Sequence, residues 1–277
     1  MAEQEIQFRK KRELGDIISD SFQFLKHESK PLLRLTIVYV LPFIILYGIA
    51  QVYVQRKVMA NVDFTDPDML MSNLGPIYSN ILFISLFSLF VQSLLSGAFY
   101  TYVEAYVKKG KDNFSLHDIT PHLFSNSLLA LGANLVLFFS VILGMFLCII
   151  PGFYFGNSLS LVVMIIIFER KGLGNALSRS WNMVHSQWWN TLLLNLTAFL
   201  IIIAISFVLS IPAMIAGVGT SALNMQEPGN LDYPNLYWVL MAISTIISSV
   251  LWVIPYTFLA LQYFNIDERT KQIQPPV

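Results

Sequence analysis

The sequence predicts an all-α, polytopic membrane protein in which six transmembrane helices form three hairpins, each preceded by a cytoplasmic amphipathic elbow helix. The first observation is a series of six long apolar stretches, since crossing about 30 Å of hydrocarbon takes about 20 helical residues. The second is composition: apolar residues make up 55% of the 277 residues and charged residues 12%, against about 25% charged in soluble proteins. The third is the distribution of basic residues among the loops. We therefore expect residues 1–277 to form a single membrane domain.

The six predicted spans follow a polar N-terminal segment, residues 1–31, and precede a polar tail, residues 265–277. They lie at residues 32–54, 80–106, 123–150, 153–168, 188–218 and 236–264. The fourth is the shortest, because 16 residues at 1.5 Å each cover only about 24 Å. A re-entrant segment is the alternative there, but it would move a basic loop to the outside. A true span is the preferred interpretation.

Basic residues predict the side on which each loop lies. With the N-terminus inside, 15 of the 17 lysines and arginines lie in or beside cytoplasmic segments, and only Arg56 and Lys57 lie outside. Lys and Arg accumulate in the cytoplasmic loops of membrane proteins. Both termini are therefore predicted to be cytoplasmic, and the protein is predicted to lie in the cytoplasmic (inner) membrane of a bacterium.

The third and fourth spans are predicted to join at the outer surface through a tight turn between Cys148 and Tyr154, because adjacent Pro151 and Gly152 favour a turn. Gly152, Gly156 and Ser160 then recur every four residues and give the fourth span a narrow face of small side chains. Such a face permits close contact between helices. Packing against a neighbouring span of the same chain is the preferred interpretation, and a dimer interface is the alternative.

Two segments outside the spans are similar to each other. Residues 14–22, which begin with Leu14 and Gly15, align without gaps to residues 173–181, and four positions are identical. In both segments apolar residues recur at helical spacing directly before a span, which is typical of an amphipathic helix at a membrane surface. Residues 115–124 hold the same place before the third span, with weaker similarity. These segments are the predicted elbows, and chance similarity of short amphipathic helices is the alternative.

The stretch from 150 to 189 carries the most specific pattern of the chain. Its parts are Ile150-Pro151-Gly152-Phe153-Tyr154, an apolar run to Glu169, residues 172–181 with Arg179, Ser180 and Trp181, and Trp188-Trp189. This pattern resembles the hallmark of the glycerophosphoryl diester phosphodiesterase membrane-domain family, and the segment at Leu14 and Gly15 resembles that family's N-terminal start. The resemblance implies a stand-alone membrane domain, because the chain has no room for the phosphodiesterase barrel to which some members are fused. Phosphodiesterase activity is therefore not expected.

Catalytic, metal-binding and nucleic-acid-binding functions find little support in the residues. The motif closest to a metal site is His117, Asp118 and His122, and no further ligand completes it at helical spacing, so we interpret these as solvated loop residues. Cys148 is the only cysteine and excludes a cysteine-based cluster. The net charge of zero provides no basic field for nucleic acid. We predict no enzymatic activity, no cofactor and no metal.

Two carboxylates near the predicted inner surface are candidates for a structural or functional role. Glu104 is the one acidic residue within a predicted span, and ionisable residues there are functional candidates by default. It precedes Lys108 by four residues, so an interfacial pair is the preferred interpretation. Glu169 ends the fourth span, and we expect it to pair with Arg179 of the following elbow and to hold the turn between them. Two independent charges are the alternative.

The predicted function is that of a non-catalytic accessory or scaffold protein in envelope or membrane homeostasis, and the alternative is a small-solute or lipid transporter. A polar cavity reaching mid-membrane would favour transport, whereas a solid bundle with a cytoplasmic groove would favour the accessory role. The expected partners are membrane lipids and a membrane protein on the cytoplasmic side. The expected contact surface combines the basic run from Arg9 to Arg12 with the elbow residues Arg179, Trp181, Trp188 and Trp189.

Overall fold

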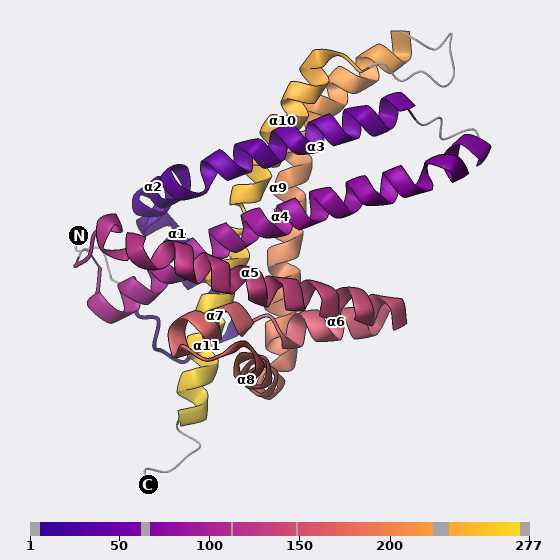
Figure 1. The fold of residues 1–277 in the computed structure, drawn as a ribbon. Helices are drawn as coiled ribbons and strands as arrows, with labels where there is room; N and C mark the ends of the chain where they lie inside the picture. Colours follow the sequence, from indigo (N-terminus) through magenta and orange to yellow (C-terminus); the bar gives the residue numbers. More distant parts are fainter. Residues whose placement is uncertain (1–5, 62–66, 112, 148, 224–232, 272–277) are drawn as a thin grey trace. The chain divides into compact units, whose positions relative to one another are not determined.

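The computed structural model describes residues 6–61, 67–111, 113–147, 149–223 and 233–271, and within these ranges the regular secondary structure is entirely α-helical (Figure 1). The described helices are α1 (Leu14–His27), α2 (Ser29–Tyr39), α3 (Leu41–Asn61), α4 (Pro67–Lys109), α5 (Leu116–Leu147), α6 (Ile149–Ser158), α7 (Val162–Glu169), α8 (Leu173–Ser186), α9 (Trp188–Leu223), α10 (Asn235–Val250) and α11 (Val253–Lys271).

Five helical segments of the described chain are long and apolar enough to cross a membrane. They are Met71–Lys109, Leu116–Leu147, Ile149–Glu169, Trp188–Val218 and Asn235–Lys271. A sixth candidate, Ser29–Tyr39 with Leu41–Val58, is broken at Val40 and is either a broken span or a re-entrant segment. The chain is therefore a multi-pass helical membrane protein with five or six candidate spans.

The surface of these helices agrees with a lipid environment. In α9, the most apolar of the candidate spans, only 11% of its most apolar window is buried inside the protein. Large apolar side chains such as Leu200, Phe207 and Ile215 are more than half exposed. Water would penalise each of these side chains by about 1.5–3 kcal/mol relative to an apolar surrounding. Hydrocarbon removes that cost.

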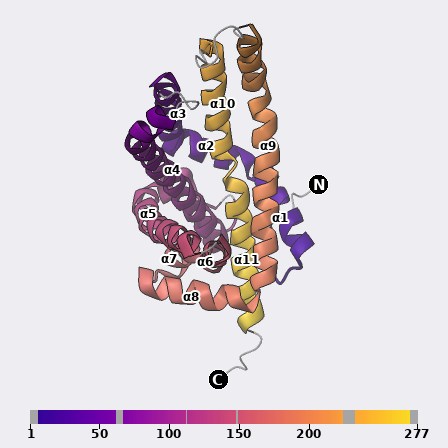
Figure 2. The same ribbon diagram turned by 90° about the vertical axis from the view of Figure 1, so that its right-hand side faces the viewer.

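The chain divides into two compact units. The first, which we call the elbow unit, comprises residues 1–40, 92–200 and 252–277, and the second unit comprises residues 41–91 and 201–251. The predicted single membrane domain stays a prediction. In the elbow unit α7 and α11 are the core helices, because every residue from Val162 to Ile167 and from Thr257 to Ile266 is buried. Helices α1 and α8 both pack against α11, and α8 lies crosswise to it (Figure 2).

The similarity between the first and third elbows extends to their three-dimensional structure. Helices α1 and α8 are both 14 residues long and begin at the aligned residues Leu14 and Leu173. Buried positions coincide in the alignment, as the following aligned pairs show: Ile17 with Ala176, Ser21 with Ser180, and Phe24 with Met183. One residue, Glu28 or Gln187, then separates each elbow helix from the next helix, α2 or α9. The likeness therefore continues past the aligned nine residues.

The predicted third elbow is not a separate helix. Residues 116–124 belong to α5, which runs without interruption from Leu116 to Leu147 and contains Pro121. Proline removes one backbone donor, but here it stands within the second turn of α5 and the helix continues. The two true elbows end because Glu28 and Gln187 leave helical geometry, with ψ angles of 14° and 38°. No described residue between 116 and 147 leaves helical geometry.

The predicted turn at Pro151 and Gly152 is wrong. Both residues lie in α6, which begins at Ile149, so the reversal of the chain comes before them. Pro151 occupies the first turn of α6, where the backbone N–H has no partner within the helix and proline is tolerated. Cys148 lies outside the described residues. The fourth span is consequently longer than predicted: α6 and α7 together form the 21-residue candidate Ile149–Glu169, with a non-helical break at 159–161.

Candidate functional site: the charged junction of α7 and α8

Three consecutive charged residues join α7 to α8 and reach different helices. Arg170, which ends α7, has φ 53° and ψ 34° and is the one non-glycine residue with positive φ in the described ranges. This conformation costs about 1–3 kcal/mol in an L-residue. The partners of the Arg170 side chain differ from those of its neighbours, since Glu169 and Lys171 pair with each other.

The partners of Arg170 are buried polar groups of α4 and α5. Arg170 Nη2 donates to both carboxylate oxygens of Glu104, at 3.0 Å and 2.8 Å, and Arg170 Nη1 donates to Asn126 Oδ1 at 2.9 Å. Asn126 Nδ2 in turn donates to Thr101 Oγ1 at 2.8 Å. The bonds from Arg170 to Glu104 are charge-assisted, which is the stronger class of protein hydrogen bond, and one guanidinium nitrogen makes both of them. They offset the strain at Arg170 and tie α4, α5 and α7 together.

Glu104 is 6% exposed, so its charge needs compensation. The predicted pair with Lys108 is present, with Lys108 Nζ 2.7 Å from Glu104 Oε1. Sequence reasoning missed Arg170 as the second partner, because it lies 66 residues further along the chain. Its only local signal is a position beside Glu169 at the end of a span. Because both cations contact it, Glu104 has a structural role and joins α4 to the end of α7.

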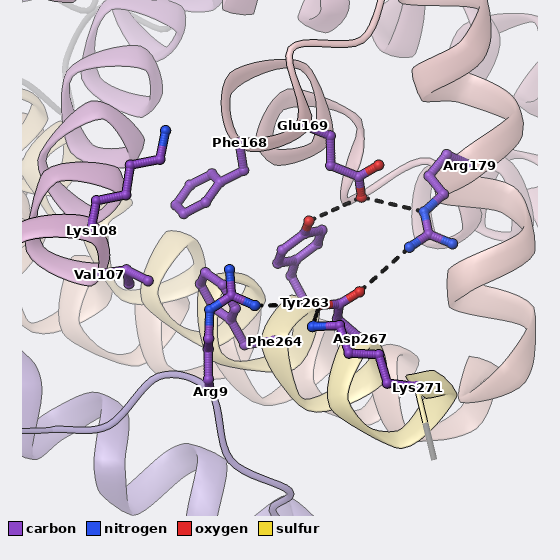
Figure 3. Close-up of a pocket in the computed structure, with 10 residues that line it drawn as sticks. All are labelled: Arg9, Val107, Lys108, Phe168, Glu169, Arg179, Tyr263, Phe264, Asp267 and Lys271. Carbon is purple, nitrogen blue, oxygen red and sulfur yellow. Dashed lines mark hydrogen bonds and ion pairs between the residues drawn. The ribbon is translucent and has the colours of Figure 1, made fainter. Parts of the chain in front are cut away.

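Glu169 is the second carboxylate of the junction (Figure 3). The predicted pair is present: Arg179 Nε donates to Glu169 Oε1 at 3.3 Å. Two further donors were not foreseen, Lys171 Nζ at 2.5 Å and the hydroxyl of Tyr263 in α11 at 3.0 Å. Arg179 also reaches Asp267 of α11, with Nη2 3.5 Å from Oδ1. The elbow helix α8 is thus held to α11 as well as to the end of α7.

A cavity of about 350 Å³ opens beside these groups. Its lining carries more basic than acidic side chains, and its aromatic members come from α7 and α11 (Figure 3). The basic residues are Arg9, Lys108, Arg179 and Lys271, the acidic ones are Glu169 and Asp267, and the aromatic ones are Phe168, Tyr263 and Phe264. The side chains of Arg9, Lys108 and Lys271 are 56%, 62% and 52% exposed. An anionic group entering the cavity would therefore meet accessible cations.

The sequence predicted that the basic run from Arg9 to Arg12 contributes to one contact surface, but the structure separates Arg9 from Arg12. Arg12 is buried, with its side chain 2% exposed, and its Nε donates to Asp20 Oδ2 at 2.7 Å. Its Nη1 donates to the carbonyl of Phe8 at 2.9 Å, while its backbone N–H donates to Asn265 Oδ1 at 2.9 Å. A guanidinium can be buried where the chain folds back and supplies this many acceptors. Arg12 is therefore structural, whereas Arg9 lines the cavity.

Ser180 and Trp181 lie away from the cavity, at the break between α6 and α7. Ser180 Oγ donates to the carbonyl of Ser158 at 2.9 Å, and Trp188 Nε1 donates to Ser158 Oγ at 3.3 Å. The first bond satisfies a backbone carbonyl that a broken span would otherwise leave unpaired. Trp181 stacks on His185 at a centroid distance of 4.6 Å. Trp181 also contacts the rings of Tyr154 and Phe155, so Ser180 and Trp181 both join α8 to α6.

The remaining predicted residues lie on α6 and α1. A Cβ on Gly152 would come 2.5 Å from Met145 Cγ and 3.2 Å from the carbonyl of Val141, so α6 touches α5 through this glycine. Gly156 faces Val141 of α5 as well. Leu14 and Gly15 begin α1, and a Cβ on Gly15 would meet nothing within 4 Å. The junction and the small-residue face are therefore separate features.

Histidines and carboxylates do not gather into a metal site in the described ranges: no group of three or more His, Cys, Asp or Glu residues there could hold an ion. Of the residues singled out in the sequence, Asp118 has a structural use. Its Oδ2 accepts the backbone N–H of Ser115 at 2.8 Å at the start of α5. A carboxylate in this position satisfies one of the donors that a helix N-terminus leaves free.

Comparison with known proteins gives a family and no function. No curated protein and no solved structure matches the chain. Residues 121–266, which include the junction, match the family described as Domain of unknown function (DUF7847). The matched region takes in every helix from α6 to α10 and most of α5 and α11. Because it covers more than half of the chain, the protein belongs to this family of domains of unknown function.

Proposed function

We propose that the protein is a non-catalytic accessory or scaffold protein of the bacterial cytoplasmic membrane, and that its elbow unit docks an acidic segment of a membrane-protein partner. The observation that carries the proposal is the cavity at the junction, whose accessible side chains are mainly basic. In this proposal the charged ends of the elbow unit face the cytoplasm, in agreement with the distribution of basic residues.

The pairing within the junction supports docking over acid–base chemistry. Glu169 accepts from Lys171, Arg179 and Tyr263, and Asp267 lies 2.7 Å from Lys271 and 3.5 Å from Arg179. A carboxylate with several cationic partners is stabilised in its charged form and is a poor proton acceptor. Arg9 and Lys108 also have acidic partners: Arg9 lies 3.7 Å from Asp267, and Lys108 lies 2.7 Å from Glu104. More than half of each basic side chain nevertheless stays exposed. These cations are suited to contact with a partner.

Co-purification from native membranes in a gentle detergent tests this function. Arg9→Gln with Lys108→Gln removes two accessible charges from the cavity, and Lys26→Gln with Lys30→Gln removes two exposed charges of the same unit outside it. We expect the first variant to lose retained partners and to complement a deletion poorly, while the second behaves as the parent chain. Equal partner profiles in the two variants would contradict the docking role.

The competing function is a small-solute or lipid transporter. The observation in its favour is that candidate spans are interrupted, at 159–161 in the fourth and at 251–252 in the last. Broken helices form substrate sites in several transporter folds. In the fourth span the carbonyl of Ser158 is bonded to Ser180, whereas the buried hydroxyl of Ser160 within the break has no partner. The resemblance to the glycerophosphoryl diester phosphodiesterase membrane domain is compatible with either function and stays a proposal.

A further inference from the structure

The second unit contains a cavity that the proposed function does not use. It measures about 340 Å³ and lies among α3, α4 and α10. Most of the residues that line it are apolar: aliphatic residues such as Val54, Ile77 and Ile84 lie on α3 and α4, and Tyr237 and Trp238 lie on α10. Its volume falls at the lower end of the range of about 300–1,000 Å³ that is usual for small-molecule sites.

Polar side chains converge on this cavity within otherwise apolar segments. They are Gln51 and Gln55 of α3 and Asn80 and Ser85 of α4. The side-chain oxygen Oε1 of Gln51 is buried and has no hydrogen-bond partner. An unpaired buried acceptor costs about 1–3 kcal/mol. A ligand with a hydrogen-bond donor would remove this cost, so the orphan oxygen points to an occupant of definite chemistry.

Charge restricts the occupant further. None of the residues that line the cavity is charged. A phosphate, carboxylate or ammonium headgroup would therefore lose its solvation without gaining a counter-ion. An uncharged hydroxyl can donate to Gln51 Oε1 and accept from the amide groups of Gln55 or Asn80 at no such cost. The aliphatic walls favour an alkyl chain beside that hydroxyl.

The position of the cavity among candidate membrane-spanning segments indicates that its ligand comes from the bilayer. Gln51 belongs to the segment Leu41–Val58, and Asn80 and Ser85 belong to Met71–Lys109, which are both candidate membrane-spanning segments. An aromatic group lies at the start of α10. The ring centroids of Tyr233 and Tyr237 are 4.4 Å apart, and those of Tyr237 and Trp238 are 4.9 Å apart. Tyr and Trp gather at the depth of the membrane interface. A hydroxyl headgroup lies at this depth in a bilayer.

We propose that the cavity among α3, α4 and α10 binds an uncharged, single-chain lipid with a hydroxyl headgroup, of the monoacylglycerol or long-chain alcohol class. The hydroxyl donates to Gln51 Oε1, and the alkyl chain lies against the aliphatic walls. The binding involves no covalent step and does not depend on the charged junction of the elbow unit.

Photo-cross-linking tests the site in the full chain, reconstituted into phosphatidylcholine and phosphatidylglycerol vesicles. The probe is a long-chain alcohol with a diazirine in its alkyl chain, and the matched probe is its methyl ether, which cannot donate. We expect the alcohol to label peptides containing residues 51–58, 77–85 and 237–241. It should label the site about fivefold more than the ether, the factor contributed by one neutral hydrogen bond.

Two variants that change the cavity and one control variant outside it test whether the labelling comes from this site. Ile84→Trp fills the cavity and should abolish labelling there, while Leu82→Trp, an exposed residue of α4 that does not line the cavity, should leave it unchanged. Gln51→Leu keeps the apolar walls and should make the alcohol and the ether label equally. Labelling that survives Ile84→Trp, or a preference for the alcohol that survives Gln51→Leu, would overturn the proposal. All three variants should elute from gel filtration as the parent chain does, so that loss of fold is distinguished from loss of the site.

Discussion

At the scale of single residues, the partners of a charge decide its role. Arg9 and Arg12 stand three positions apart, but the side chain of one is 56% exposed and that of the other is 2% exposed. Glu104 and Glu169 similarly end as shared acceptors, each contacted by more than one cation. A charge in such a network contributes stability only while its partners remain, because a buried ion that loses its partner keeps its desolvation cost.

Arg12→Gln should strongly destabilise the protein. The substitution removes the ion pair with Asp20 and several hydrogen bonds to backbone carbonyls, including that of Phe8. Breaking a buried pair costs about 3–5 kcal/mol. The thermal unfolding temperature of the purified protein in detergent should fall clearly, while Lys10→Gln, at an exposed position, leaves it unchanged. Equal unfolding temperatures for the two variants would show that Arg12 is not a core residue.

Exchanging the charges of Glu169 and Arg179 should rescue stability only in part. Each single reversal places like charges 3.3 Å apart and is expected to destabilise. In the double variant Glu169→Arg with Arg179→Glu the pair returns, but Lys171 then faces an arginine and Asp267 faces a glutamate. A double-mutant cycle on unfolding temperature measures the coupling. Complete rescue would mean that Lys171 and Asp267 contribute nothing to the junction.

At the scale of elements, two repeated elbow helices frame the core of the elbow unit. Helices α1 and α8 share their length, their buried positions and the single residue that follows each of them. Burial selects the same face in both helices, although α1 packs mainly against α11 and α8 mainly against α7. Residues 115–124 have a comparable apolar pattern but no break, so they extend α5 instead. An apolar period predicts the helix, whereas its end depends on local capping and on the contacts around it.

Two glycine substitutions should have opposite effects, although both glycines belong to the pattern that resembles a known family. Gly152→Ala places a methyl group 2.5 Å from Met145 Cγ and 3.1 Å from the Met145 nitrogen, so α5 and α6 must separate. Overpacking of this kind costs about 1–3 kcal/mol. Gly15→Ala meets open space in a helix and should stabilise by about 0.5–1 kcal/mol. Thermal unfolding of both variants in the same detergent measures the difference, and a neutral Gly152→Ala would exclude close contact at this position.

At the scale of the whole molecule, some of the candidate spans consist of two helices. Helices α6 and α7 are separate at 159–161, and α2 and α3 are separate at Val40. Each pair is a full crossing or a re-entrant segment, and the two possibilities place the following loop on opposite sides. The distribution of basic residues favours full crossings, with the charged junction in the cytoplasm.

Thiol labelling of single cysteines should establish this topology. In a chain whose only cysteine, Cys148, is replaced by serine, cysteines at Lys30 and Lys171 should resist an impermeant reagent in intact cells and react in inverted vesicles. A cysteine at Lys57 should show the reverse. Glu169 keeps Arg179 and Tyr263 as partners when Lys171 is replaced, so the fold should persist. Labelling at Lys171 in intact cells would show that α6 and α7 together do not cross.

The sequence by itself determined the helical membrane class, the positions of most long helices and the two related elbows, because these depend on apolar content and on a local period of 3.6 residues. It also indicated the pairs Glu104 with Lys108 and Glu169 with Arg179, whose members lie within ten residues of each other. Tertiary structure alone decided the rest. Arg170 on Glu104, Tyr263 on Glu169 and Arg12 in the core depend on chain segments that meet only after folding. The unpaired oxygen of Gln51 likewise needs three packed helices to define it, since burial without a partner is a property of surroundings and not of residue type.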